Sequence, residues 1–223
     1  MFKKKVLIYL LILQGLILFS CKNNQEKGPI ENIDMKGAVD HAKYGTRFDI
    51  DPVNSMVNWT GFKPTGSHNG SIMIKKGEVF TDNDGKVMGG LIHLDMKSIE
   101  CLDIKDVNDK KDLEDHLKSP EFFNVDSFPV VEFFVDSFQI VPEEKTNTVV
   151  FGQLTIKGIT HSLEIKAHIG MAGDVMMITV PEFKLDRTKW NMTYKSKSTF
   201  PNLMDKFIND ELSVSMTLLA MRQ

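Results

Sequence analysis

The sequence predicts an all-β fold, an antiparallel β-barrel of about eight strands with one or two short helices. Apolar and polar residues alternate along many short segments, which is the pattern of strands with one buried face. Turn residues separate these segments, and no regular strand–helix alternation indicates a parallel sheet. An antiparallel sandwich has the same pattern, but a barrel is favoured because closure removes the edge strands.

Composition is that of one globular domain with additional sequence. The chain has 223 residues, of which 42% are hydrophobic and 26% charged, and its formal net charge is -3. Both signs of charge are mixed along the chain, whereas nucleic-acid binding usually requires a concentrated basic face. We therefore expect no nucleic-acid partner.

The N-terminus, residues 1–20, is predicted to be a lipoprotein signal peptide. Residues 3–5 are lysines and residues 6–19 are almost wholly apolar, as in a secretory signal. The apolar run is short for a membrane span. It ends in Leu18-Phe19-Ser20-Cys21, which resembles the lipobox of bacterial lipoproteins. That resemblance implies cleavage before Cys21, acylation of Cys21 and attachment to a membrane. The alternatives are an uncleaved anchor and a coincidental cysteine.

Residues 21–43 are predicted to be a flexible tether that follows the lipidated cysteine. They are polar, contain Asn, Gln, Gly and Pro, and show no apolar periodicity. The barrel domain is expected to occupy residues 44–223.

Within this domain, alternation and turn residues predict nine strands. They are residues 47–50, 54–62, 69–80, 87–98, 130–141, 149–156, 163–169, 176–180 and 211–221. The sequence Asp82-Asn83-Asp84-Gly85 is typical of a hairpin turn between two of them.

One helix is predicted between the strands. Asn108 is expected to cap its start, and Leu113 and Leu117 share one face because they are four residues apart. Pro120 is expected to end it or to begin a second short turn.

The stretch 116–138 contains six of the 15 phenylalanines. Burial of one Phe side chain is worth roughly 1.5–3 kcal/mol, so these rings are not expected to stay in water. The rings either fill a solid core or surround a ligand. Leu113, Leu117, Phe122 and Phe123 are expected to cover one end of the barrel, and Phe133 to face inward.

This stretch also resembles the most distinctive segment of the YceI-like family. The resemblance rests on HLKSPEFFNV at 116–125, Phe128-Pro129 and Glu132-Phe133, together with WTGFK at 59–63, GSHNG at 66–70, GQLTIKGIT at 152–160 and FKLDRTKW at 183–190. Trp190 and Asn191 stand where the family often has Phe and Gly. The similar segments span residues 44–221 in the family's order.

The resemblance implies a lipocalin-like antiparallel barrel with a long amphiphilic cavity. Characterised members hold polyisoprenoids or related long-chain lipids and perform no chemistry on them. The expected activity is therefore non-enzymatic storage or transport of such a lipid, without a cofactor.

Inward positions of the predicted strands are the candidate lining of this cavity. They are Trp59, Ile72, Ile74, Ile92, Leu94, Met96, Phe133, Leu154, Ile165, Ile178 and Met216. The same residues would equally fill a solid core. The 13 methionines favour an adaptable apolar surface.

Four basic residues are candidates for the polar mouth of the cavity: Lys63, His68, Arg187 and Lys189. An amphiphilic ligand requires a few polar groups for its head, and Arg binds phosphate with two parallel hydrogen bonds. A salt bridge of Arg187 with Asp186 or another carboxylate, and a loop hydrogen bond of His68, are the structural alternatives.

Metal binding and catalysis are not predicted. His161 and His168 would lie on opposite faces of one strand, and no pair of histidines has a recognisable ligand spacing. No Gly-x-Ser-x-Gly motif is present. Cys101 is expected to be a small buried residue. A cluster of His68, His93 or His161 with carboxylates would revive the hypothesis of an enzyme or metal carrier.

The sequence therefore predicts a lipid-binding lipoprotein of the cell envelope, held on a membrane by Cys21 and facing the periplasm or the cell surface. The alternative is an envelope interaction module whose solid barrel binds a protein partner. The sequence leaves the membrane, the lipid and homodimer formation open.

Overall fold

The computed structural model describes residues 45–141 and 145–223. In these residues, ten strands, one α-helix and three short 3-10 helices follow one another. The strands are β1 (Thr46–Ile50), β2 (Met56–Lys63), β3 (Gly66–Thr81), β4 (Val87–Asp95), β5 (Glu100–Cys101), β6 (Val130–Ile140), β7 (Thr148–Ile156), β8 (Ile159–Ala172), β9 (Val175–Asp186) and β10 (Glu211–Arg222). The helices are α1 (Val107–Lys118), η2 (Met96–Ser98), η3 (Arg187–Trp190) and η4 (Met204–Lys206).

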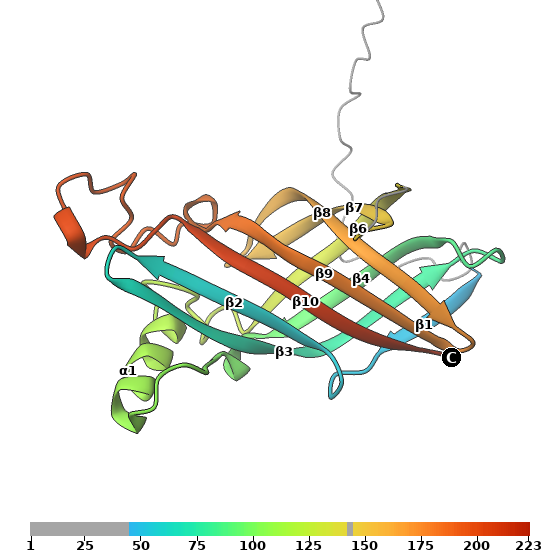
Figure 1. Cartoon of the computed structure of the whole chain (residues 1–223), viewed down its shortest axis with the longest axis horizontal. Helices are drawn as coiled ribbons and strands as arrows, with labels where there is room; N and C mark the ends of the chain where they lie inside the picture. The colour runs from blue at the N-terminus through green and yellow to red at the C-terminus, as the bar shows by residue number, and fades with distance from the viewer. Residues whose placement is uncertain (1–44, 142–144) are drawn as a thin grey trace, which may run out of the picture. The chain divides into compact units, whose positions relative to one another are not determined.

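Eight of the strands close into an antiparallel barrel (Figure 1). Neighbours in the wall are β10, β2, β3, β4, β6, β7, β8 and β9, and β9 pairs with β10 to complete the circle. The predicted fold class is thus confirmed. Closure gives each of these eight strands a partner on both sides, although β8 and β9 pair only at His168–Ala172 and Val175–Thr179.

β1 lies beside the same two strands as β2, further along the barrel wall. It pairs with β10 at Phe48–Ile50 and with the distal part of β3, whereas β2 pairs with the other halves of the same two strands. Between them, the Asp51 carboxylate accepts hydrogen bonds from the backbone N–H groups of Val53 and Asn54 at 2.8 and 3.2 Å. The gap between β10 and β3 is therefore filled by two successive strands, β1 and β2, joined by the turn at Asp51.

The walls follow the alternation of the sequence. In β8, for example, Ile165 and Ala167 are buried while Glu164 and His168 are exposed. Some glycines stand where a large ring of the neighbouring strand packs directly against the backbone. A Cβ atom at Gly152 would lie 2.6 Å from the Phe133 ring and 2.4 Å from the carbonyl oxygen of Phe134.

Helix α1 begins two residues earlier than predicted. Asp106, and not Asn108, is its N-cap, because the Asp106 side chain accepts from the backbone N–H groups of Asn108 and Asp109. The predicted strand 87–98 also ends early: Asp95 caps η2 by accepting from Lys97 N. The two-residue strand β5 was not predicted, and it pairs with Gly70 and Ser71 of β3.

One half of the barrel interior is solid. It holds buried apolar residues from β1 and from the distal parts of the wall strands, among them Phe48, Ile74, Val79, Met176, Ile178 and Leu218. Figure 1 places β1 and the C-terminus at this end, and α1 and the β9–β10 connection at the opposite end. The two ends of the barrel thus differ in construction.

The predicted signal peptide and tether, including Cys21, lie outside the described residues. Among the described residues, no helix has the length and apolarity to cross a membrane.

Candidate ligand pocket and its mouth

The half of the barrel beside α1 contains an apolar pocket of about 300 Å³. Each of the eight wall strands contributes to its lining, and so do α1 and the connection between β9 and β10. Its volume lies at the lower end of the roughly 300–1,000 Å³ of ligand pockets. The interior is therefore neither wholly solid nor an open channel.

Almost all side chains that line the pocket are apolar. The exceptions, apart from the indole of Trp59, are Lys63, His68, Arg187 and Asn209. Such a lining favours an apolar ligand body with few polar contacts, because burial of each unpaired polar ligand atom would cost free energy.

Nine of the eleven predicted lining residues surround this pocket: Trp59, Ile72, Ile92, Leu94, Met96, Phe133, Leu154, Ile165 and Met216. Ile74 and Ile178 do not line it. They are buried in the solid half, at exposures of 2% and 8%, because they face inward further along β3 and β9. Alternation predicted their direction but not their height in the barrel.

The end of the pocket is covered by residues from α1 and the segment after it. Leu113, Leu117, Phe122 and Phe123 all line the pocket, where the sequence placed them. An aromatic cluster connects this cover to the β9–β10 connection: the His116 ring lies 5.0 Å from Phe122 and 4.6 Å from Tyr194, edge-on in both pairs. The lining residues Met192 and Ile208, on the connection itself, were not predicted because no periodicity marks them.

The structure brings three of the four predicted mouth residues to the pocket. Lys63, His68 and Arg187 line it, whereas Lys189 is exposed and does not. The backbone carbonyl of Lys189 instead accepts a hydrogen bond from the His161 ring nitrogen at 3.0 Å. Contact of these residues with a ligand head stays a prediction.

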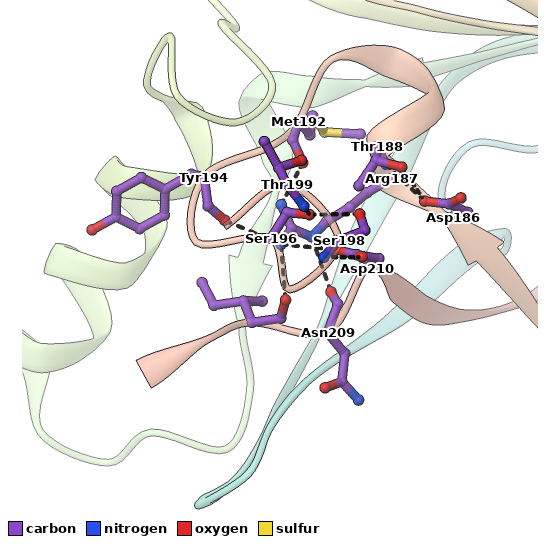
Figure 2. A network of polar contacts seen from close by, with 11 residues as sticks. Asp186, Arg187, Thr188, Met192, Tyr194, Ser196, Ser198, Thr199, Asn209 and Asp210 are labelled. Carbon is purple, nitrogen blue, oxygen red and sulfur yellow. Dashed lines mark hydrogen bonds and ion pairs between the residues drawn. The ribbon is translucent and has the colours of Figure 1, made fainter. Parts of the chain in front are cut away.

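Arg187 is the most buried of these, with 3% of its surface exposed. Figure 2 shows its guanidinium enclosed by the connection that follows it. It donates to the carbonyl oxygens of Asn209 at 3.0 Å, Tyr194 at 3.1 Å and Ile208 at 3.0 Å, and to that of Met192. These bonds fold the β9–β10 connection back over the mouth and use four of the five guanidinium N–H groups.

A carboxylate accompanies Arg187, as the structural alternative anticipated, but it is Asp210 and not Asp186. Asp210 Oδ1 lies 3.9 Å from the guanidinium, while Asp186 accepts from Thr188 N and Oγ1 at the start of η3. Burial lowers the pKa of Arg187, against the charges of both carboxylates. Burial acts to raise the pKa of Asp210, but hydrogen bonds from Ser196 and Ser198 and the charge of Arg187 outweigh it, so this pKa lies below its ordinary value.

His68 belongs to a second polar cluster at the mouth. Its Nδ1 lies 3.0 Å from Asp103 Oδ2, and the Cys101 thiol donates to Asp103 Oδ1 at 3.1 Å. Burial acts to raise the pKa of Asp103, but the bonds from Asn69 N, Cys101 and His68 lower it to about 2. The structural alternative for His68, a hydrogen bond within the loops, is thus present. No sequence spacing connects His68 to Cys101 and Asp103.

A closed antiparallel barrel of eight strands, with an apolar pocket at one end and a polar rim, defines the class of lipocalin-like barrels with an internal ligand site. The family model described as the YceI-like domain matches residues 48–220. The chain therefore belongs to the YceI-like family, as its motifs indicated.

Solved structures agree with this fold. BcnA of Burkholderia cenocepacia is 17% identical with a TM-score of 0.62, over 77% of this chain and 99% of that chain. A polyisoprenoid binding domain from Saccharophagus degradans, implicated in plant cell wall breakdown, is 12% identical with a TM-score of 0.56, over 79% and 98%. A comparison with curated proteins finds none similar in sequence to this chain.

Proposed function

We propose that this protein holds a polyisoprenoid or another long-chain amphiphilic lipid in the barrel pocket, without chemical change, as a membrane-tethered lipoprotein of the cell envelope. The observation that carries the proposal is the apolar pocket of about 300 Å³ beside α1. Burial of a lipid tail there would contribute about 0.8 kcal/mol per methylene. The polyisoprenoid binding domain that shares the fold supports the ligand class.

The polar rim supports the orientation of such a ligand. Lys63 and His68 lie where β2 and β3 meet at the mouth, and both carry side chains that interact with a phosphate, carboxylate or amide head. The tail would then point toward the solid half of the barrel, which sets the depth of the pocket. A barrel that is solid throughout, as the protein-binding alternative requires, has no such support, because one half of the interior is hollow.

Gly61 offers the sharpest test of the pocket. It lines the pocket, and a Cβ atom there would meet no other atom within 4 Å. Gly61→Leu should therefore occupy ligand space without a backbone clash. Native mass spectrometry and lipid extraction of the purified protein should find a lipid on the wild type and several-fold less on Gly61→Leu.

Gly170→Leu is the matched control. A Cβ atom at Gly170 also meets nothing within 4 Å, but this residue lies on β8 outside the pocket lining. It should keep the wild-type lipid content. Equal lipid on both variants, or no lipid on the wild type, would refute binding in this pocket.

Membrane attachment through Cys21 is a separate part of the proposal, supported by the lipobox-like sequence. Cells fed a labelled fatty acid should incorporate label into the wild type but not into Cys21→Ser. A Cys21→Ser protein that still carries the label would contradict acylation at this cysteine.

A further inference from the structure

Three side chains with different metal-binding donors converge at the mouth of the barrel. His68 Nδ1, Cys101 Sγ and a carboxylate oxygen of Asp103 all lie within 4.8 Å of one another. They come from β3, β5 and the residues just after β5, which the pairing of Gly70 with Cys101 holds side by side. Lipid binding in the barrel pocket requires neither Cys101 nor Asp103.

We propose that His68, Cys101 and Asp103 bind one Zn²⁺ ion, with a fourth coordination position open to solvent. This inference does not rest on the proposed lipid function.

The donor set favours zinc. Thiolate, imidazole and carboxylate are the three side-chain ligands of protein zinc sites, and three protein ligands leave one position for water. Thiolate excludes a preference for Mg²⁺ or Ca²⁺, which bind oxygen ligands. Within one tetrahedral site, donor atoms lie roughly 3.3–3.8 Å apart, as follows from metal–ligand bonds of about 2.0–2.3 Å. His68 Nδ1 lies 3.0 Å from Asp103 Oδ2 and Cys101 Sγ lies 3.1 Å from Asp103 Oδ1, so each carboxylate oxygen is close to that spacing from one other donor.

Supporting contacts already hold the donors in place. The backbone N–H of Asn69 donates to Asp103 Oδ1 at 3.0 Å, and Glu114 of α1 accepts from the backbone N–H of Cys101 at 2.9 Å. Backbone hydrogen bonds from Ile104 and Asp103 also reach the Cys101 sulfur. Such outer contacts orient ligands and tune a metal site.

A zinc ion can reach the three donors from solvent, and the protons displaced on binding can leave to solvent. Cys101 is fully buried, but the side chains of His68 and Asp103 keep 32% and 29% of their surface exposed, so an ion can arrive from solvent. The thiol proton that now lies between Cys101 and Asp103 would be released to solvent as the Zn–S bond forms. His68 Nδ1, which now donates to the ionised Asp103 carboxylate, would release its proton to solvent while Nε2 takes one up, so a neutral imidazole binds with no net loss of a proton. The ionised carboxylate binds without losing a proton.

Metal titration of the full-length protein tests the proposal directly. Cys21→Ser should be introduced first, because the chain has two cysteines and Cys101 then becomes the single thiol. Co²⁺ should bind at one ion per chain, with thiolate-to-cobalt absorption in the near ultraviolet and visible bands of tetrahedral cobalt, and Zn²⁺ should displace it. Absence of the thiolate band at saturating Co²⁺ would overturn the proposal whatever the variants do.

Single variants assign the ligands. Cys101→Ser, His68→Ala and Asp103→Asn should each weaken Zn²⁺ binding by more than about 100-fold, since loss of an outer contact alone costs about 10–100-fold. His93→Ala is the control, because His93 also pairs with a carboxylate, Glu132, at 2.7 Å but lies outside the cluster. Unchanged Zn²⁺ affinity in the three ligand variants, or an equal loss in His93→Ala, would show that the ion binds elsewhere.

Discussion

Arg187 determines the local structure of the pocket mouth. It is nearly fully buried, and its guanidinium holds carbonyl groups from both ends of the β9–β10 connection. A buried cation is tolerated when hydrogen bonds and a counter-charge replace its water, and here carbonyl dipoles and Asp210 do so. The residue was predicted as a head-group ligand, and its observed contacts make it first a structural anchor.

Replacement of Arg187 by Lys should therefore destabilise the domain although the charge is kept. A single ammonium group cannot reach the four carbonyl oxygens that Arg187 binds. We expect a loss of about 3–5 kcal/mol in the free energy of unfolding, measured by urea denaturation. Lys189→Met, at the exposed neighbour, should change it by less than about 0.5 kcal/mol. A wild-type urea midpoint for Arg187→Lys would contradict the anchoring role.

Asp210 should make this region sensitive to acid. Its pKa lies below the ordinary value of 3.8. The ionised carboxylate therefore contributes stability above that value, and the contribution is lost as the pH falls below it. The difference in unfolding free energy between the wild type and Asp210→Asn should be largest near neutral pH and shrink below about pH 4. The exposed Asp205→Asn serves as the control, and a difference that grows in acid would have the wrong sign.

At the scale of elements, local patterns predicted what depends on neighbours in sequence. Alternation identified the eight wall strands, and the turn at residues 82–85 lies between β3 and β4 as expected. Strand β5 was missed because two residues carry no alternation. Its position depends on Gly70, which is about 30 residues away in the chain and pairs with Cys101.

For the same reason, the sequence named His68 with carboxylates as a cluster that would revive metal binding, but it did not identify Cys101 and Asp103 as its neighbours. His68 and Asp103 are 35 residues apart and meet only because β5 lies along β3. Sequence periodicity describes one strand at a time, so it carries no information on which strands become neighbours. The lining was predicted better, because inward direction is a property of a single strand.

Gly70 should prove indispensable to the contact between β3 and β5. A Cβ atom there would lie 1.8 Å from the carbonyl oxygen of Glu100 and 2.5 Å from the Trp59 ring. Gly70→Ala should cost about 1–3 kcal/mol in the free energy of unfolding, because backbone must move. Gly61→Ala on the adjacent β2, where a Cβ meets no atom within 4 Å, should be close to neutral. Equal urea midpoints for the two variants would refute this packing.

At the scale of the whole molecule, the barrel combines a solid half and a hollow half within one hydrogen-bonded wall. The solid half supplies close packing, and the hollow half supplies space for a ligand. Leu154 and Ile178 represent the two halves, since each is 8% exposed but only Leu154 lines the pocket.

Shortening one side chain in each half should have different effects on stability and on lipid content. Ile178→Ala should cost about 2–5 kcal/mol of unfolding free energy, because it leaves a new cavity, and should not change the lipid bound per folded chain. Leu154→Ala should cost less, because the removed volume joins existing space, and should change lipid content. Urea denaturation and lipid extraction measure both effects. The reverse pattern would show that the solid and hollow halves are assigned incorrectly.

Closure of the wall has a kinetic consequence. Along most of the wall, a molecule inside the pocket cannot leave between strands without breaking a ladder, and the solid half blocks the far end of the axis. The exception is the span between β8 and β9 beside the pocket, because these two strands pair only at His168–Ala172 and Val175–Thr179. It must pass either that span or the end covered by α1 and the β9–β10 connection. The residence time of any ligand is therefore governed by local opening of this half of the barrel, where α1 has no fully buried residue, and not by the global unfolding rate.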